Sequence, residues 1–345
     1  MSKKNRVTIT ELAHTAGVSI ATVSRVLNHK SLVSEETRRR VEAAIADLNF
    51  RPDPSARGLR GMPSRLVALI IPDILNVYYT ALSKEIEQKL QENGYTMLLG
   101  ITHDQSGLMH EYLEKFSGMN IDGLLYVPPP CYETSPYIRS LAQTGLPILE
   151  INRRREEDLF FGVEPDNFGA ATQALEYLYQ LGHRQIALVV GSSETSTGLK
   201  RLEGYRYFHI KQGISMDPSL IKVGDFSRVF GETAACELLA QKGNHPFSAI
   251  FATSNRLLLG VMRVLQEKQI DIPEDLSVIA MDDAEWLETL SPAITTVDVA
   301  IEEMAALSVD LLLRQIKNRS ANETPRTYTL STALKIRNSC QPLIK

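Results

Sequence analysis

Residues 8–28, TITELAHTAGVSIATVSRVLN, predict two short helices joined by a tight turn. Thr8 and Glu11 have the spacing of a capping box, in which each of the two side chains binds a free backbone amide at a helix start. Gly17 can adopt the left-handed conformation that ends a helix, and Ser19 can cap the helix that follows. This order of caps and glycine turn predicts a helix-turn-helix motif.

A third helix is predicted from residue 35 to about residue 48, with Ser34 as its cap. Apolar side chains recur at helical spacing in all three helices, as expected for elements that pack on one another. They are Ile9, Leu12, Ala13 and Ala16; Val23, Val26 and Leu27; and Val41, Ala44, Ile45 and Leu48. Three such helices can close a small core, so we expect residues 1–50 to form a separate head.

Residues 51–64 contain a weaker helix signal. Pro54 follows Asp53, which is a favourable helix start. Gly58, however, costs about 1 kcal/mol relative to alanine, and the segment is shorter than the ~12 residues that an isolated helix needs. The segment therefore predicts either a helix that forms only beside a partner or a proline-punctuated linker.

Positive charge is concentrated near the N-terminus. The chain carries a net charge of −4, yet residues 1–65 hold 12 Lys and Arg against 6 Asp and Glu, so this segment carries +6 and the rest carries −10. Basic charge on a head with a binding architecture favours a nucleic-acid partner, although charge alone is also typical of solvated surface.

Length and composition indicate a soluble protein. The 345 residues suffice for about two to three domains, and 43% hydrophobic with 23% charged residues is typical of a globular chain. No apolar run reaches the ~18 residues that span a membrane, and the N-terminus lacks the apolar core of a secretory signal. We therefore expect a cytoplasmic protein without membrane contact. Cys131, Cys236 and Cys340 lie far apart, which predicts reduced thiols.

Common catalytic motifs are missing from the sequence. It contains no phosphate-binding loop, no dinucleotide-binding glycine motif, no HExxH zinc motif and no GxSxG nucleophile elbow. The seven histidines show no metal-ligand spacing. Asp282 and Asp283 resemble a pair of catalytic carboxylates, but neighbours at a strand end point in different directions. We therefore expect neither an enzyme nor a bound metal or cofactor.

Beyond residue 65, short β-rich runs alternate with helical periods, which is typical of parallel sheets covered by helices. The runs form two series, residues 66–71, 96–99 and 123–127 followed by residues 185–190, 249–252 and 277–281. The pattern predicts two successive α/β lobes. Ligands of such sheets lie beyond the carboxyl ends of the strands, so the cleft between the lobes is the expected binding site.

The head and hinge resemble the lac repressor (LacI/GalR) family over Val7–Ala13, Ala16–Asn28 and Arg51–Leu59. The resemblance continues along the body at Ile71-Pro72-Asp73, Ile121-Asp122-Gly123-Leu124, Asp166-Asn167, Leu181-Gly182-His183-Arg184, Ile272-Pro273-Glu274-Asp275, Asp282-Asp283 and Pro292–Val297. It implies an α/β fold in which a three-helix helix-turn-helix head and a hinge helix precede a two-lobed, periplasmic-binding-protein-like core of parallel sheets.

By this resemblance the chain crosses between the lobes three times. The implied divisions are residues 1–50 for the head, 51–64 for the hinge, 65–163 plus about 298–325 for the first lobe, and 164–297 plus about 326–345 for the second. A helix near residues 301–316 is expected to return to the first lobe, and a single strand, Tyr328–Leu334, is expected to join the second.

The resemblance implies DNA contacts from the head and the hinge. Ile20 and Ala21 take the positions that choose the operator sequence, and as apolar residues they can contact thymine methyls or exclude other bases. Arg25 is the candidate for a bidentate guanine contact, with a phosphate contact as the alternative. The other candidates are Thr8, Ser19, Thr22, Ser24 and Asn28, short polar residues suited to phosphate although Thr8 and Ser19 could serve only as caps, and Ala56 of the hinge.

Leu59 is implied to insert between the central base pairs from the minor groove, where an apolar wedge kinks the duplex. The alternative is that Leu59 only covers the neck of the body. The implied operator is double-stranded and near-palindromic with a central C-G step, and a two-fold dimer reads it. The sequence shows no terminal leucine heptad, which favours a homodimer over a tetramer.

The resemblance also implies an effector site in the cleft. An aromatic pair, an arginine and an aspartate suit a small polyhydroxylated ligand, a sugar or sugar derivative. The candidates are Tyr78, Tyr79, Thr197, Arg201, Phe226, Ser254, Asn255 and Asp282. Of the adjacent Tyr78 and Tyr79, we expect only one to face the ligand. Thr253-Ser254-Asn255-Arg256 departs from the family's Asn-Asp pattern, and Arg256 could recruit an anion or extend to solvent.

The implied function is a ligand-responsive, sequence-specific bacterial transcription regulator. Effector binding would alter the angle between the lobes and so the spacing of the hinge helices, with release of a repressor from DNA as the favoured direction and a corepressor as the alternative. An enzyme or a plain solute-binding protein remains a remote alternative, because the head has no role in either.

Overall fold

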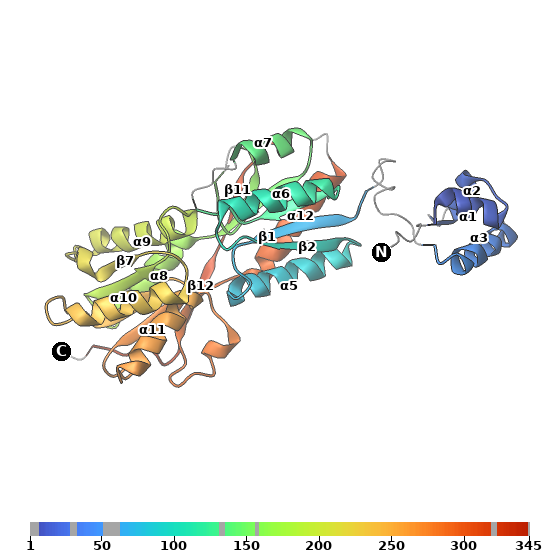
Figure 1. Cartoon of the computed structure of the whole chain (residues 1–345). Coiled ribbons are helices and arrows are strands. Elements are labelled where there is room, and N and C mark those ends of the chain that lie inside the picture. The colour runs from blue at the N-terminus through green and yellow to red at the C-terminus, as the bar shows by residue number, and fades with distance from the viewer. Residues whose placement is uncertain are drawn as a thin grey trace. The chain divides into compact units, whose positions relative to one another are not determined.

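The computed structural model describes residues 7–27, 33–50, 63–130, 135–155, 159–318 and 323–343. The chain divides after Ser64 into two compact units, residues 1–64 and residues 65–345 (Figure 1). Each unit is described separately below.

The head contains the three predicted helices, α1 (Ile9–Ala16), α2 (Ile20–Leu27) and α3 (Glu35–Asp47). The predicted capping box is confirmed, because Thr8 N donates to Glu11 Oε2 at 2.7 Å and Glu11 N donates to Thr8 Oγ1 at 3.3 Å. Gly17 ends α1 at φ 61°, and Ser19 Oγ accepts from the amide of Thr22 at 3.1 Å. Local sequence signals therefore fix both ends of the turn.

One apolar cluster holds the head together. Leu12 of α1, Val23 of α2 and Val41 of α3 are fully buried in it. Arg40 Nη2 also donates to the carbonyl oxygens of Ala16 and Gly17, at 2.7 and 3.1 Å, and so binds the turn from α3. The core and this bond fix α2 relative to the other two helices.

The first lobe is a six-stranded parallel sheet between two pairs of helices, with the strand order β11-β5-β4-β3-β1-β2. The strands are β1 (Leu66–Ile71), β2 (Thr96–Ile101), β3 (Gly123–Tyr126), β4 (Ile148–Ile151), β5 (Phe161–Pro165) and β11 (Thr327–Leu330). The helices are α5 (Val77–Glu92) and α12 (Ile301–Lys317) on one face and α6 (Ser106–Gly118) and α7 (Ser135–Gln143) on the other.

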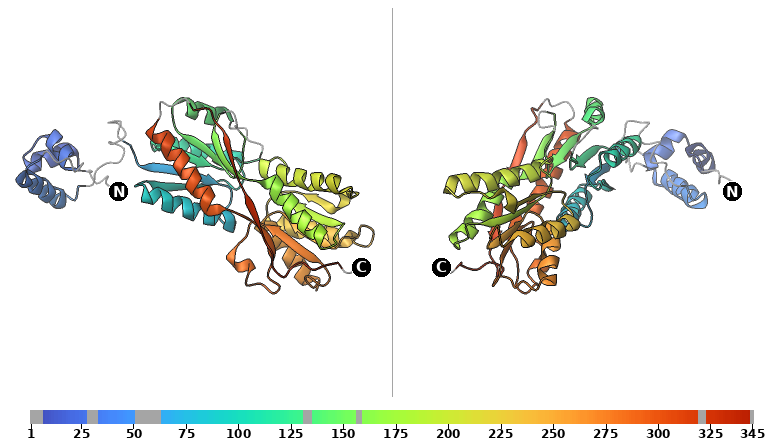
Figure 2. Two further views of the ribbon diagram at one scale, coloured as in Figure 1. Left: turned by 180° about the vertical axis from the view of Figure 1, so that it is seen from behind. Right: turned by 60° about the vertical axis from the view of Figure 1, so that its left-hand side comes forward.

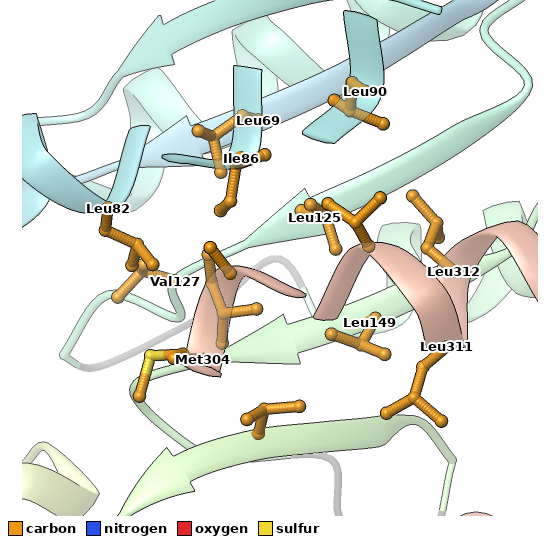
Figure 3. Packing of buried hydrophobic residues seen from close by; sticks show 14 of the residues in the cluster. Leu69, Leu82, Ile86, Leu90, Leu125, Val127, Leu149, Met304, Leu311 and Leu312 are labelled. Carbon is orange, nitrogen blue, oxygen red and sulfur yellow. The ribbon is translucent and has the colours of Figure 1, made fainter. Parts of the chain in front are cut away.

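Successive residues of β1 enter two different cores. Leu69 packs in the cluster that contains Ile86 of α5 and Leu312 of α12 (Figure 3). The next residue, Ile70, belongs to the opposite cluster with Met109 of α6. Burial on both faces explains why the strand is a continuous apolar run, as is typical of parallel sheets.

The second lobe repeats this architecture with the strand order β12-β10-β9-β8-β6-β7. Its strands are β6 (Ile186–Val190), β7 (Ile221–Val223), β8 (Ala249–Ala252), β9 (Ser277–Met281), β10 (Thr295–Val299) and β12 (Thr332–Lys335), with short 3-10 turns at Pro218–Leu220 and Glu285–Leu287. α8 (Asn167–Gln180) and α9 (Ser196–Gln212) cover one face, and α10 (Arg228–Gln241) and α11 (Asn255–Glu267) cover the other.

The chain crosses between the two sheets at three neighbouring places (Figure 2). It passes from β5 to α8, from β10 to α12, and from β11 to β12. The implied lobe boundaries at residues 163 and 298 therefore fall inside β5 and β10 rather than between elements. Each of the two strands ends within its own sheet before the chain passes to the other lobe.

The expected single strand Tyr328–Leu334 is wrong. β11 pairs in parallel with β5 of the first lobe, whereas β12 pairs antiparallel with β10 of the second. The exposed Ser331 alone separates the two strands, so no glycine or proline marks the change of sheet. Apart from this antiparallel β12, the predicted fold class of two parallel-sheet lobes behind a helical head is confirmed.

None of the helices in the described ranges is long and apolar enough to cross a membrane. Within the same ranges, His, Cys, Asp and Glu side chains form no cluster that could hold a metal ion.

Candidate functional site

The second helix of the head presents a face that is free of the core. Val23 and Val26 point into the apolar cluster, whereas Ile20, Ala21 and Arg25 are exposed. The two apolar residues at its start are those that the resemblance assigns to sequence choice. Ile20 at the helix start is 42% accessible and lies outside the apolar cluster of the head, so it is available to a partner.

Some of the polar residues that are proposed to contact DNA also cap helices of the head. Thr8 is part of the capping box, and the hydroxyl of Ser19 lies 2.9 Å from that of Thr22. Ser24 is partly exposed on α2. Asn28, Ala56 and Leu59 lie outside the described residues, so their DNA roles stay predictions.

A cavity of about 570 Å³ lies between the lobes of the body. Residues from both lobes line it, and they follow the carboxyl ends of strands, as predicted for parallel sheets. The first lobe contributes residues after β1, β2 and β4, and the second contributes residues after β6, β7, β8 and β9. The loops of both sheets therefore meet at one site.

Seven of the eight predicted effector residues line this cavity: Tyr78, Tyr79, Thr197, Arg201, Phe226, Ser254 and Asp282. Asn255 does not. It is the first residue of α11 and is buried at 2% exposure, while its neighbours Ser254 and Arg256 reach the cavity. Consecutive helix residues point in different directions, so a three-residue stretch cannot present every side chain to one site.

Both tyrosines of the aromatic pair line the cavity, contrary to the expectation that only one would face it. The two rings meet edge to face with centroids 5.1 Å apart. Asn152 binds both hydroxyls, because Tyr78 Oη donates to its Oδ1 at 3.0 Å and its Nδ2 donates to Tyr79 Oη at 2.8 Å. Burial raises the pKa of Tyr79 to about 12, so its hydroxyl keeps its proton at neutral pH.

Arg201 and Asp282 face each other on the wall formed by the second lobe. Arg201 Nη2 donates to Asp282 Oδ1 at 3.4 Å, Nε donates to Asn167 Oδ1 at 2.9 Å, and Nη1 donates to the carbonyl oxygen of Thr253. Asp282 has the left-handed φ of 66°, unusual for a residue other than glycine. Burial raises the pKa of its carboxyl, and the Arg201 guanidinium opposes that shift.

Asp283 points away from Asp282, as the sequence predicted. It accepts two bonds from Arg337, at 2.7 and 3.0 Å, and one from Lys335 at 2.8 Å. Although burial acts to raise the pKa of the Asp283 carboxyl, the hydrogen bonds from Arg337, Lys335 and Thr296 hold it well below its ordinary value. This aspartate binds the last strand to the second lobe and does not line the cavity.

Several cavity residues of the first lobe were missed from the sequence, including two that follow β4. Asn152 and Arg153 follow β4, and Arg153 donates to both carboxylate oxygens of Asp104 at 2.6 and 3.2 Å. Its guanidinium carbon also lies 5.3 Å from the ring centroid of Phe226 in the second lobe. The rule that ligand residues follow strand ends could have found them, because residues 148–151 are apolar except for Glu150.

Arg256 lines the cavity and pairs with Asp73, a partner that neither alternative proposed for it included. Its Nε lies 3.6 Å from Asp73 Oδ2, and the two residues come from different lobes. The other carboxylate oxygen of Asp73 accepts from the amide of Leu75 at 2.8 Å. The ion pair thus links the two walls of the cavity.

Two family models match the chain. The one described as "Bacterial regulatory proteins, lacI family" matches residues 8–53, and the one described as "Periplasmic binding protein-like domain" matches residues 175–340. These matches cover the head and most of the second lobe.

Whole-length relatives are similar across the chain. It is 30% identical to the HTH-type transcriptional regulator DegA of Bacillus subtilis over 98% of this chain and 99% of the relative. It is 31% identical to the HTH-type transcriptional regulator CelR of Thermobifida fusca over 98% and 100%. It is 30% identical to the HTH-type transcriptional repressor CytR of Escherichia coli K12 over 97% of each chain.

Solved structures agree on the fold. A transcriptional regulator CelR–cellobiose complex matches with a TM-score of 0.72 and 29% identity over 97% of this chain and all of that one. The lac repressor dimer bound to operator and the anti-inducer ONPF matches with a TM-score of 0.83 and 24% identity over 98% and 100%. With its helix-turn-helix head, its two-lobed body and these full-length relatives, the chain belongs to the lacI family of bacterial regulatory proteins and is a transcriptional regulator.

Proposed function

We propose that this regulator is a repressor that binds a near-palindromic DNA operator as a homodimer and leaves it when a sugar or sugar derivative occupies the cleft. The observation that carries the ligand assignment is the convergence of two tyrosines, Phe226, Arg201 and Asp282 on one cavity between the lobes. The CelR relative, whose structure is described as a cellobiose complex, supports a sugar as the ligand class.

The head supplies the DNA contacts in this proposal. The start of α2 enters the major groove, where Ile20 and Ala21 contact base methyl groups and Arg25 reaches a guanine edge. Hydroxyl groups and the surplus of basic residues bind phosphates, so affinity falls steeply with salt. A two-fold dimer places one α2 on each half-site, which requires a near-palindrome.

The cleft supplies the ligand contacts. Sugar rings present apolar C–H faces that suit the aromatic rings of Tyr78, Tyr79 and Phe226. Their hydroxyl groups can donate to the carboxylate of Asp282 and accept from the guanidinium of Arg201. We assign the cleft no catalytic role, and a regulator of chromosomal DNA acts in the cytoplasm.

Ligand and operator are coupled through the angle between the lobes. A ligand that contacts both walls favours one lobe arrangement, and the dimer binds DNA in the other. Such coupling is reciprocal and typically amounts to about 1–3 kcal/mol. A corepressor that favours the DNA-binding arrangement is the alternative within the same family.

Selection of random duplex DNA by the purified full-length protein tests the proposal. The selection runs without additives and with a pool of neutral mono- and disaccharides. A palindrome enriched without sugar and lost with the pool supports a ligand-released repressor. Enrichment only with sugar establishes the corepressor alternative, and an asymmetric site that sugar leaves unchanged overturns the proposal.

A further inference from the structure

Every arginine that lines the cavity already has an acidic partner. Arg153 is held by Asp104 in a two-bond contact, as described above. The other two pairs are Arg201 with Asp282 at 3.4 Å and Arg256 with Asp73 at 3.6 Å. The positive charges of the cavity are therefore balanced within the protein.

Besides these ion pairs and the two tyrosines, the titratable side chains that line the cavity are solvent-exposed. His103 and Asp225 are exposed, and Asp225 Oδ1 accepts from the amide of Ser227 at 2.9 Å. Water screens charges at such positions. Neither residue is therefore a buried charge that a ligand would have to neutralise.

Helix starts at the cavity are also satisfied, although helix N-termini commonly attract anions. Each of the four helices that begin there has a side-chain cap that accepts from a first-turn amide. The caps are Asn76 for α5, Thr195 for α9, Ser227 for α10 and Ser254 for α11. The amides that an anion would use are thus partly occupied.

Some polar side-chain atoms of the cavity lack hydrogen-bond partners within the described residues. Thr197 Oγ1 is buried, belongs to a lining residue and has no hydrogen-bond partner among the described residues. The Nε atom of Arg153 is also buried without a hydrogen-bond partner, and that of Arg256 has only the 3.6 Å ion pair with Asp73. All of these atoms can donate a hydrogen bond, and a neutral hydroxyl group can accept it, so none of them requires a ligand with a formal negative charge.

We propose that the effector of this regulator carries no net charge: it is an uncharged polyhydroxylated sugar, and the cleft discriminates against phosphorylated and carboxylated sugars. This inference rests on the proposed function, because it assumes that the cleft is the effector site. An anion that takes a guanidinium from its aspartate would leave that carboxylate without its partner, and the carboxylate of Asp282 is buried.

Matched sugars give the primary test. Thermal shift with full-length protein first ranks neutral mono- and disaccharides, among them glucose and cellobiose. The best binder is then titrated by calorimetry beside its 6-phosphate and its C6-carboxylate. We expect the neutral sugar to bind about tenfold more tightly or better, since no free cation repays the dehydration of the anion.

Removal of one aspartate should relax this discrimination. Asp104→Asn frees Arg153 to bind an anionic group, so the preference for the neutral sugar should fall by about fivefold or more. The matched control is Asp310→Asn, which also removes a carboxylate paired with an arginine, at 2.7 Å from Arg314, but on an exposed face outside the cavity. The control should keep the wild-type preference.

The outcomes separate this inference from the proposed function. Equal or tighter binding of an anionic sugar by the wild type overturns the uncharged ligand and leaves a sugar-responsive regulator intact. An unchanged preference in Asp104→Asn overturns the role of charge balance. If no sugar in either set binds, the proposed function fails and this inference fails with it.

Discussion

Replacement of Asp282 by asparagine should separate ligand binding from folding. The substitution keeps the shape of the side chain and removes the charge that ligand hydroxyls are proposed to meet. Hydrogen bonds to charged groups contribute about 1.5–3 kcal/mol, which corresponds to a loss of sugar affinity of about 10- to 150-fold. Operator affinity without sugar should stay near the wild-type value, because the proposed DNA contacts come from the head and the hinge and none comes from Asp282.

The folded state should lose little stability in Asp282→Asn. Burial raises the pKa of this carboxyl, which means that the folded state favours the protonated form. The resulting contribution to folding stability is complete at low pH and is lost as the pH rises through the raised pKa. At pH 7 the buried charge therefore acts against folding, and its removal offsets the lost attraction to Arg201. Arg201 also keeps its bonds to Asn167 and Thr253. The unfolding midpoint should move by no more than about 3 °C.

Asp283→Asn is the matched comparison at the next position. The depressed pKa of Asp283 means that its stability contribution is present above the ordinary carboxyl pKa and is lost as pH falls. Breaking its buried contacts with Arg337 and Lys335 should cost about 3 kcal/mol and lower the unfolding midpoint by about 6–12 °C. Sugar affinity should stay within about threefold of wild type, because this carboxylate lies outside the cavity.

Calorimetric titration of the best sugar and thermal circular dichroism, both at pH 7, measure the two effects. The reasoning is refuted if Asp282→Asn binds sugar like the wild type. It is also refuted if Asp283→Asn, still folded at the titration temperature, loses as much sugar affinity as Asp282→Asn.

Three further substitutions test the head, the first lobe and the link between lobes. Arg25→Ala should cost about 1–3 kcal/mol at one operator base pair, measured by fluorescence anisotropy; an equal loss on all sequences would instead assign Arg25 to a phosphate. Gly162→Ala should lower the unfolding midpoint by about 6 °C or more, because the new Cβ would lie 2.1 Å from the guanidinium of the fully buried, ion-paired Arg154; an unchanged midpoint would contradict this packing. Arg256→Gln removes the partly exposed ion pair with Asp73 and should change sugar affinity by less than about fivefold. The substitution should also weaken the dependence of sugar affinity on salt concentration. A salt dependence equal to that of the wild type would exclude a role for the ion pair.

The head could be read from the sequence because its signals are local. Thr8 and Glu11 are three residues apart, Gly17 directly ends α1, and Ser19 binds the amide of Thr22. Each of these interactions depends on neighbours in the chain and needs no distant partner. The contribution of Arg40, which binds the turn from α3, had no comparable signal.

The last crossover could not be read in this way. Residues 327–331 alternate polar and apolar side chains, the next run contains Thr332, Ala333 and Leu334, and no glycine or proline separates the two. The change of sheet depends on the edges offered by β5 and β10, which lie far away in the chain. The tertiary structure, and not the local sequence, therefore determines which strand each of these segments pairs with.

The cleft was partly predictable. Asp282 and Phe226 were assigned by the family resemblance, and the rule that strand ends of parallel sheets meet at one edge supports Asp282, which follows the predicted run 277–281. The same rule applied to β4 would have added Arg153. The pairing of Arg256 with Asp73 had no sequence signal, because it joins the two lobes.

Ligand control of DNA binding is tested most directly by operator affinity measured during a sugar titration. The selected duplex is labelled, and its dissociation constant for the full-length protein is followed by anisotropy as the best neutral sugar is added, with Asp282→Asn in parallel. We predict that the sugar weakens wild-type binding by about 5- to 150-fold, in line with typical coupling energies, and leaves the variant unchanged. An operator affinity that no cleft-binding sugar alters, or an equal response in the variant, would contradict the assignment of the cleft as the site that controls DNA binding.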